Sequence, residues 1–261
     1  MRHLARAMRD ALRLLLPSVR REREYTLRRS RALGVELAAA SRLGPEWSAG
    51  RQWGQGFDER VVELPWVVAR LGQCARMLDV GSALNSPALI EAVKARCDEV
   101  VFLNPFPDDA FRSAQPGVSY VAADVRRHWL APGSFDVVTC VSTLEHIGCD
   151  NSRYGAPPGR EPDPAQARLA AMRAMRELCA SGGRLLLTVP LGRLEDHDWF
   201  VQLDEAALQA AIAAFAPSHA EVERFIHAGM WRRADAAECE GVAYGAATRG
   251  ASAVACVELH A

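Results

Sequence analysis

Lysine is almost absent from this chain of 261 residues: Lys94 is the only one, and arginine supplies the remaining positive charge. The 31 basic residues are balanced by 32 acidic ones, which gives a net charge of −1. A chain so balanced lacks the global positive field of nucleic-acid-binding proteins, so we expect no nucleic-acid partner. It also lacks any apolar run near the roughly 20 residues that a bilayer span needs, which favours a cytoplasmic protein.

Metal-binding and disulfide patterns are missing as well. The sequence contains no C-x-x-C, H-x-x-H or H-E-x-x-H motif and no acidic cluster, so we expect no metal site. Its seven cysteines are an odd number, and several lie inside apolar stretches, as Cys140 does in the run from Val137 to Val141. We therefore expect small buried residues with reduced thiols rather than partners in disulfides.

The overall composition is that of a globular protein. Hydrophobic residues make up 49% of the chain and charged residues 24%, enough to bury a substantial core. The length suits one full domain and an appendage, at roughly 100–200 residues per domain. Because the pattern becomes regular near residue 57, we place a basic helical extension at 1–56 and the main domain at 57–261.

The first residues form a basic, amphipathic pattern. Residues 1–33 hold ten arginines and three acids, and Leu4, Met8 and Leu12 recur at helical spacing. Arg13 interrupts the apolar run, which argues against a signal peptide. A helix of this kind either lies on an anionic membrane surface, as a peripheral contact, or packs on its own domain or on the second subunit of a homodimer.

From residue 57 onward, apolar strands alternate with amphipathic helices. We expect strands at 76–80, 99–103, 118–122, 135–141, 184–189, 220–225 and 251–259, and helices at 58–71, 86–96, 164–180, 204–215 and 234–240. Pro65 predicts a kink or an interruption in the first helix. The alternation predicts an α/β fold with a doubly wound, mostly parallel, seven-stranded Rossmann-like sheet. The last two strands fit a hairpin-like addition, which gives the sheet an antiparallel edge strand.

The turn after the first expected strand is the first candidate for a ligand site. In a doubly wound sheet, ligands bind at the carboxyl ends of the strands, where the strand order reverses. Here the chain reads Asp79-Val80-Gly81-Ser82, and Gly81 allows a tight turn and close approach of a ligand to the backbone. The helix expected from Pro87 would direct its amide dipole toward this turn and favour an anionic group.

Two further motifs give the turn a more specific meaning. Ala123-Asp124 follows the third expected strand, and Phe135-Asp136-Val137-Val138 opens the fourth. Together with the turn they resemble the class I S-adenosylmethionine-dependent methyltransferases, over about residues 57–260. Residues 142–148 and 150–154 are similar to a bacterial group of these enzymes that modifies small molecules or glycans.

The resemblance implies S-adenosyl-L-methionine as the cofactor and a set of residues that bind it. They are Asp79, Gly81 and Ser82 at the methionine end, Asn104 after the second strand, Asp124 and the backbone of Val125 at the adenine, and Ser142 at the end of the fourth strand. Carboxylates suit a ligand that carries a cationic amine and a sulfonium. From the residues alone, Asp79 could instead cap the turn, and Asp124 could cap a helix.

Three positions depart from the family pattern. Ala83 and Asn85 stand where the family usually has glycine, and Asn104 stands where an acid usually chelates the ribose hydroxyls. Asn104 offers one acceptor carbonyl and no negative charge. These departures motivate an alternative, a methyltransferase-like binding or scaffold protein without turnover. The missing glycines also argue against a nicotinamide-dependent enzyme of similar topology, which needs G-x-G-x-x-G.

Candidates for the chemistry follow the fourth and fifth strands. An oxygen or nitrogen acceptor loses a proton on methylation, so a base near the cofactor helps. His146 is the better candidate on its ordinary pKa, with Glu145 beside it, although the pair could instead cap the turn. The expected acceptor-binding residues are Arg153, Tyr154, His197 and Trp199. We expect methyl transfer to an oxygen or nitrogen of a small molecule or glycan precursor.

Overall fold

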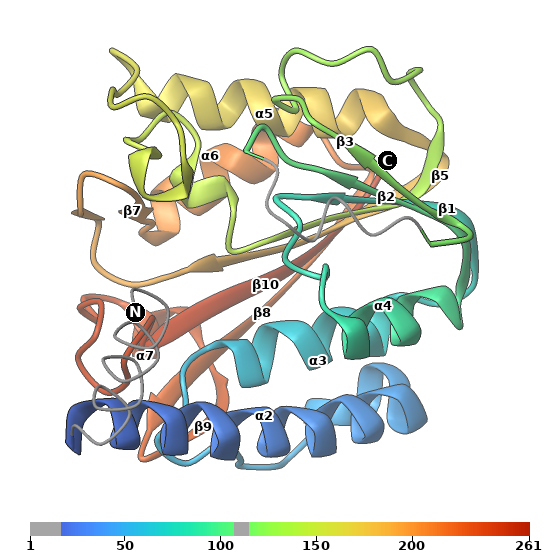
Figure 1. Cartoon of the computed structure of the whole chain (residues 1–261). Helices are drawn as coiled ribbons and strands as arrows, with labels where there is room; N and C mark the ends of the chain where they lie inside the picture. The colour runs from blue at the N-terminus through green and yellow to red at the C-terminus, as the bar shows by residue number, and fades with distance from the viewer. Residues whose placement is uncertain (1–16, 107–114) are drawn as a thin grey trace, which may run out of the picture.

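The computed structural model describes residues 17–106 and 115–261, which fold around one large sheet (Figure 1). Five of its strands are parallel: β1 (Cys74–Val80), β2 (Cys97–Leu103), β3 (Val118–Val121), β4 (Phe135–Val141) and β5 (Cys179–Pro190). The sheet continues through β10 (Ala253–His260), β8 (His219–Ala228) and β9 (Met230–Ala234). The full order is β3-β2-β1-β4-β5-β10-β8-β9.

The last three strands alternate in direction. β10 lies antiparallel between β5 and β8, and β9 is an antiparallel edge strand on β8. The doubly wound, mostly parallel sheet with an antiparallel edge strand is therefore confirmed. The eighth strand, β9, escapes prediction from the sequence because Arg232 and Arg233 break the apolar pattern of a buried strand. A separate two-stranded ribbon joins β6 (Glu195–Asp196) and β7 (Val201–Gln202).

Helices cover both faces of the sheet (Figure 1). α5 (Pro164–Leu178) and α6 (Glu205–Phe215) pack on one face, and α3 (Arg60–Arg70) and α4 (Pro87–Lys94) pack on the other. The remaining helices of the described residues are α2 (Pro17–Leu43), α7 (Ala236–Cys239) and the short 3₁₀ helices η1 (Gly44–Ser48), η3 (Leu144–His146) and η4 (Ser152–Tyr154). Apolar side chains fill the space between the sheet and each helical layer, so the core has two parts.

Pro65 lies inside α3 without interrupting it. Proline has no N–H to donate to the carbonyl four residues earlier, which is that of Val61. In this fold the indole Nε1–H of Trp53 donates to the Val61 carbonyl at 2.9 Å instead. Because the vacated acceptor is satisfied, α3 continues as one helix, and the predicted interruption is wrong.

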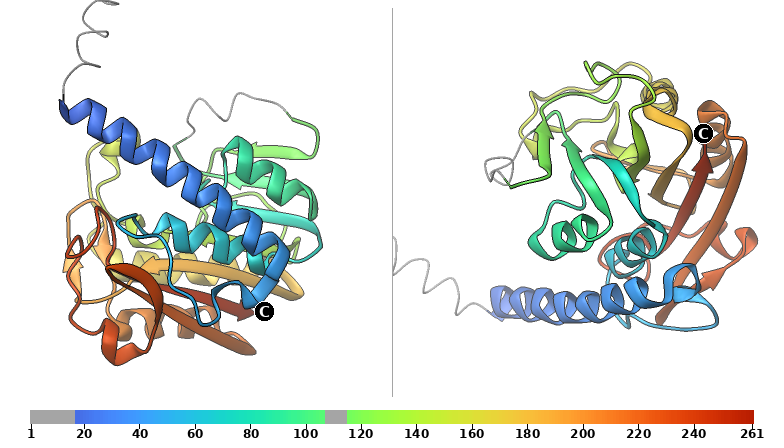
Figure 2. Two further views of the ribbon diagram at one scale, coloured as in Figure 1. Left: turned by 90° about the horizontal axis from the view of Figure 1, so that it is seen from below. Right: turned by 90° about the vertical axis from the view of Figure 1, so that its right-hand side faces the viewer.

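The described part of the N-terminal extension packs on the domain. α2 runs along α3 on the outside of the molecule (Figure 2), and its Leu37 and Ala40 are buried. Trp47, in η1, is fully buried and donates its indole N–H to Glu36 at 3.0 Å. Residues 1–16, on which the amphipathic pattern falls, lie outside the described residues, and their contact with a membrane or a second subunit stays a prediction. Within 17–106 and 115–261, no helix combines the length and apolarity that crossing a membrane requires.

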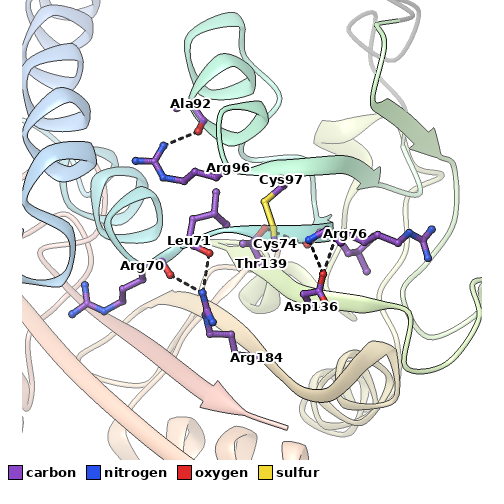
Figure 3. Close-up of a disulfide and its surroundings, with 12 residues drawn as sticks. Arg70, Leu71, Cys74, Arg76, Ala92, Arg96, Cys97, Asp136, Thr139 and Arg184 are labelled. Atoms are coloured by element: carbon purple, nitrogen blue, oxygen red, sulfur yellow. Dashed lines mark hydrogen bonds between the residues drawn. A yellow bond between two sulfur atoms is a disulfide. The ribbon is translucent and has the colours of Figure 1, made fainter.

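One pair of cysteines is oxidised, so the expectation that all seven thiols are reduced is wrong. Cys74 and Cys97 form a disulfide that joins the first residues of β1 and β2 (Figure 3). The parallel register places these residues opposite each other, with Cα atoms 4.7 Å apart. Their separation of 23 residues forms no recognisable motif, so only the strand pairing reveals the bond. The five other cysteines are free and buried.

Candidate active site

A cavity of about 860 Å³ opens at the carboxyl ends of the central parallel strands. Its wall includes Val80 and Gly81 from the end of β1, Leu103 and Asn104 from the end of β2, and Ser142 after β4. These strands lie on either side of the point where the winding of the sheet reverses, which is where doubly wound folds bind ligands. The volume lies within the range of small-molecule sites, roughly 300–1,000 Å³.

The turn after β1 is packed tightly against the loop after β4. Gly81 has a φ of +93° and Ser82 a φ of +61°, both in the left-handed region. A Cβ on Gly81 would lie 2.1 Å from the Oγ1 of Thr143, so only glycine fits here. Gly81 therefore brings the backbone, rather than a side chain, to the cavity wall.

Asp79 lies behind this turn and does not line the cavity. Its buried carboxylate accepts the backbone N–H of Leu84 at 2.8 Å and the hydroxyl of Thr139 at 2.7 Å. Burial raises the pKa of Asp79 to about 7, against the opposing effect of these hydrogen bonds and of Arg60. These hydrogen bonds match the turn-capping alternative that the sequence leaves open, and a contact of Asp79 with the cofactor stays a prediction.

Two polar atoms of the turn have no partner among the described residues. The Oγ of Ser82 and the Nδ2 of Asn85 are buried without a hydrogen bond. Neither residue lines the cavity, so the expected contact of Ser82 with the cofactor stays a prediction. α4, by contrast, contributes no residue to the cavity wall, so the lining does not support the expected role of its dipole.

The polar side chains near β2 and β3 are engaged with the protein itself. The Oδ1 of Asn104 accepts the N–H of Phe106 at 2.9 Å, while its amide group reaches toward the Gly81 carbonyl at 3.5 Å. The carboxylate of Asp124 accepts hydrogen bonds from the side chain and the backbone N–H of Arg126. Although burial acts in the opposite direction, these contacts lower the pKa of Asp124. Asn104, Asp124 and the buried Val125 all line the cavity.

A charged pair on α3 reaches the same cavity and was not apparent from sequence motifs. Ser142, with φ +39°, donates its hydroxyl to the Oε1 of Glu63 at 2.6 Å. Thr188 donates to the same oxygen at 2.8 Å, and Arg60 donates to the Oε2 of Glu63 at 3.3 Å. Glu63 is fully buried, and Arg60 lines the cavity. The signal in the sequence is a charged pair three residues apart in the first turn of a helix whose next residues up to Arg70 are apolar.

His146 lines the cavity with its ring held in one orientation. Its Nδ1–H donates to the carbonyl of Trp199 at 2.9 Å, which leaves the lone pair on Nε2. Burial lowers the pKa of His146 to about 4, so the ring is neutral at pH 7. Glu145 is buried behind the wall and does not line the cavity, and burial raises its pKa to about 8. Among the described residues, no group of three or more His, Cys, Asp or Glu side chains could hold a metal ion.

Aromatic rings surround His146. Arg153 and Tyr154, on η4, line the cavity, and the Tyr154 ring lies 5.4 Å from the His146 ring. The centre of the Trp199 ring lies 5.1 Å from that of the His146 ring. The guanidinium of Arg153 lies over the Trp199 ring, 4.5 Å from its centre. His197 stacks on Phe200 and, like Trp199, supports the wall without lining it.

Three solved structures with a similar fold are distant in sequence. The N-methyltransferase NodS from Bradyrhizobium japonicum WM9 is 15% identical, with 77% of this chain and 94% of that chain covered and a TM-score of 0.47. Its complex with S-adenosyl-L-homocysteine is 14% identical, covering 88% and 96%, with a TM-score of 0.45. The 1,6-didemethyltoxoflavin-N1-methyltransferase of Burkholderia thailandensis is 13% identical, covering 76% of each chain, with a TM-score of 0.47. Likenesses this distant say nothing of the acceptor.

The family of the chain is shown by a family model and not by these structures. No curated protein matches the chain. The model described as "Methyltransferase domain", however, matches residues 1–234, which is most of the sequence. The chain therefore belongs to this methyltransferase family and is a transferase that uses S-adenosylmethionine as its methyl donor.

Proposed function

We propose that this enzyme methylates an oxygen or nitrogen atom of a small molecule or glycan precursor that carries an anionic group. The observation that supports it most is the orientation of His146, whose Nδ1–H is held by the Trp199 carbonyl while Nε2 keeps a free lone pair. Arg153 lines the same cavity and makes no ion pair within the described residues. A base and an unpaired guanidinium on one wall suit an acceptor that has both a proton to lose and a negative charge.

The residues at the other end of the cavity fit the cofactor. When bound, S-adenosylmethionine supplies a methyl group on a sulfonium centre and leaves as S-adenosylhomocysteine. Gly81 lines the cavity and gives the cofactor access to the backbone of the turn. Val125 and Leu103 offer apolar contact, and Asp124 keeps acceptor oxygens at the wall even while it is paired with Arg126.

His146 handles the proton in this proposal. Its low pKa of about 4 keeps the imidazole neutral and able to accept a proton at physiological pH. The same low pKa makes it a weak base, so it takes the proton only as methylation makes the acceptor atom acidic. Proton transfer to Nε2 therefore accompanies or follows formation of the new bond to carbon. Arg153 holds the anionic group, and Tyr154 packs on the acceptor beside it.

An acceptor screen with matched pairs tests the proposal. Phenolic, amine and sugar acceptors are each offered in a carboxylated or phosphorylated form and in a neutral form, with radiolabelled S-adenosylmethionine. We expect label in the anionic member of at least one pair, and we expect Arg153→Met to remove the preference. Label that favours the neutral members throughout would contradict the anionic acceptor. Calorimetry with S-adenosylhomocysteine checks cofactor binding separately, so an inactive sample is not mistaken for a wrong acceptor class.

A further inference from the structure

Four arginines line the cavity, and they differ in what else they contact. Arg126 is bound by Asp124 and Glu161, and Arg160 is bound by Asp196. Both guanidinium groups therefore have carboxylate partners within the protein. Within the described residues, Arg153 contacts the ring of Trp199 and makes no ion pair, and Arg60 makes one ion pair, to Glu63. A guanidinium has five N–H donors, so Arg60 retains most of its capacity for a ligand.

Arg60 is fixed close to the turn that follows β1. It is the first residue of α3, and its partner Glu63 accepts the hydroxyl of Ser142 at 2.6 Å. The next residue, Thr143, packs against Gly81 so closely that a Cβ there would lie 2.1 Å from it. Arg60, Gly81, Thr143 and His146 all line the same cavity, so Arg60 faces the cavity that the turn borders.

Among the described residues 17–106 and 115–261, no other positive group without a carboxylate partner lines the cavity at this end. The turn contributes Val80, Gly81 and Ala83, none of which carries charge, and α4 contributes no residue. The dipole of α4, which the sequence offers as the partner of an anion, is thus outside the lining. The other unpaired guanidinium, that of Arg153, is on η4, beyond His146 along the chain and stacked on Trp199.

We propose that Arg60 binds the carboxylate at the amino-acid end of S-adenosylmethionine, with Glu63 as the residue that positions it. Guanidinium and carboxylate match as a fork of two parallel hydrogen bonds, which ammonium or backbone groups do not reproduce. Glu63 tethers Arg60 to the end of β4 through Ser142 and to β5 through Thr188. The inference rests on the cofactor of the family and not on the proposed acceptor, so either can fail without the other.

The first test needs no variant. Calorimetry compares binding of S-adenosylhomocysteine with that of its decarboxylated analogue, in which hydrogen replaces the carboxylate. We expect the analogue to bind about 10–100-fold more weakly, as the loss of a charge-assisted pair implies. Equal affinities on the unaltered protein would show that the carboxylate has no partner, and would overturn the proposal.

The second test assigns the effect to Arg60. In Arg60→Met, S-adenosylhomocysteine should bind about 10–100-fold more weakly while the analogue binds as before, so that the difference between the two ligands disappears. Arg153→Met is the matched control, because it removes the other unpaired guanidinium of the cavity; the difference should persist in it. If Arg60→Met weakens both ligands equally, Arg60 has a structural role only and the proposal is wrong.

A double variant covers the case in which Arg60→Met fails to fold because Glu63 is left buried without its cation. Arg60→Met with Glu63→Gln removes both charges, while the glutamine carbonyl still accepts from Ser142 and Thr188. The double variant should lose as much affinity for S-adenosylhomocysteine as Arg60→Met does, and no affinity for the decarboxylated analogue. Glu63→Gln alone keeps the guanidinium but loosens it, so we expect a loss of a few-fold for the carboxylated ligand only. Unchanged affinity in the double variant would again contradict the proposal.

Discussion

The two ends of the cavity use their polar side chains in opposite ways. At the turn after β1, Asp79 is hydrogen-bonded within the protein and Asp124 is paired with Arg126. At the other end, His146 keeps a free Nε2 and Arg153 has no carboxylate partner among the described residues. Apart from Arg60, the cofactor end therefore presents mainly backbone and engaged side chains, whereas the acceptor end presents unpaired groups that can do chemistry. Variants at the two ends should accordingly differ in which measurement they change.

The largest effect is expected for His146→Ala. Loss of a general base typically lowers turnover about 10²-fold or more, and the cofactor end is untouched. With an acceptor from the screen, kcat should fall by that factor while the affinity for S-adenosylhomocysteine changes less than about twofold. His219→Ala, on the exposed part of β8, is the matched control and should leave kcat as it is. If kcat and the affinity for S-adenosylhomocysteine fell by the same factor, the two ends of the cavity would not have the separate roles described above.

The pH profile of the unaltered enzyme follows from the same residue. Because burial lowers the pKa of His146 to about 4, the base is already neutral at pH 5 and above. We expect kcat to stay level between pH 8 and 5 and to fall as His146 takes up a proton near pH 4. A fall centred near the ordinary value of about 6.5 would mean that His146 is not the base or is not buried during turnover.

Gly81→Ala should give the next largest change, and at the cofactor end. The added Cβ meets Thr143 in a backbone region that L-residues rarely adopt, so we expect a loss of about 2–3 kcal/mol in the free energy of unfolding and about tenfold weaker binding of S-adenosylhomocysteine. Gly50→Ala is the matched control, since Gly50 also has a positive φ but has no atom within 4 Å of the new Cβ. Urea titration and calorimetry measure the two quantities. Equal losses in both variants would assign the effect to backbone strain rather than to the packed turn.

Glu145→Gln should stabilise the protein, and more so as the pH rises. Burial raises the pKa of Glu145 to about 8 in the folded state, compared with about 4.3 when unfolded. Between these values the folded carboxyl holds a proton that the unfolded one has lost, so the free energy of unfolding falls with increasing pH. The variant should gain roughly 1–3 kcal/mol at pH 8 and nothing near pH 4, where both states are protonated. Urea titrations at several pH values measure this. The exposed Glu221→Gln serves as control, and a gain independent of pH would exclude burial as the cause.

Asp124→Ala should have the smallest effect. If its paired carboxylate still accepts a hydrogen bond from the cofactor, removal should weaken binding of S-adenosylhomocysteine about three- to tenfold without unfolding the protein. Arg126→Gln is the complementary variant, because it frees the carboxylate of Asp124 from its ion pair. In this variant the affinity for S-adenosylhomocysteine should rise or stay the same. Identical affinity in Asp124→Ala would show that the adenine has another partner.

Seven strands of the main sheet could be predicted from the sequence because their signals are local. β4 begins and ends at the predicted residues, Phe135 and Val141, since the apolar run itself defines the buried strand. His146 could be singled out for the same reason, as it follows a recognisable strand and the fold brings all carboxyl ends to one edge.

What the sequence did not predict depends on pairs of residues far apart along the chain. Arg60 and Glu63 matter because Glu63 meets Ser142 and Thr188, which are 79 and 125 residues away from it. The continuity of α3 through Pro65 depends on the indole of Trp53, which lies outside the helix. Such contacts leave no periodic trace in the sequence, so only the fold reveals them.

The disulfide between Cys74 and Cys97 has a consequence for the covalent topology of the cofactor-binding half. With it, β1, its turn and α4 form a closed ring, so a single peptide-bond cut within residues 75–96 releases no fragment. Limited proteolysis followed by electrophoresis should therefore show one band without reductant and two with it. The polypeptide that carries the Gly81 turn is thus held at the far end of β1 by a bond whose state is set by the surrounding thiol chemistry.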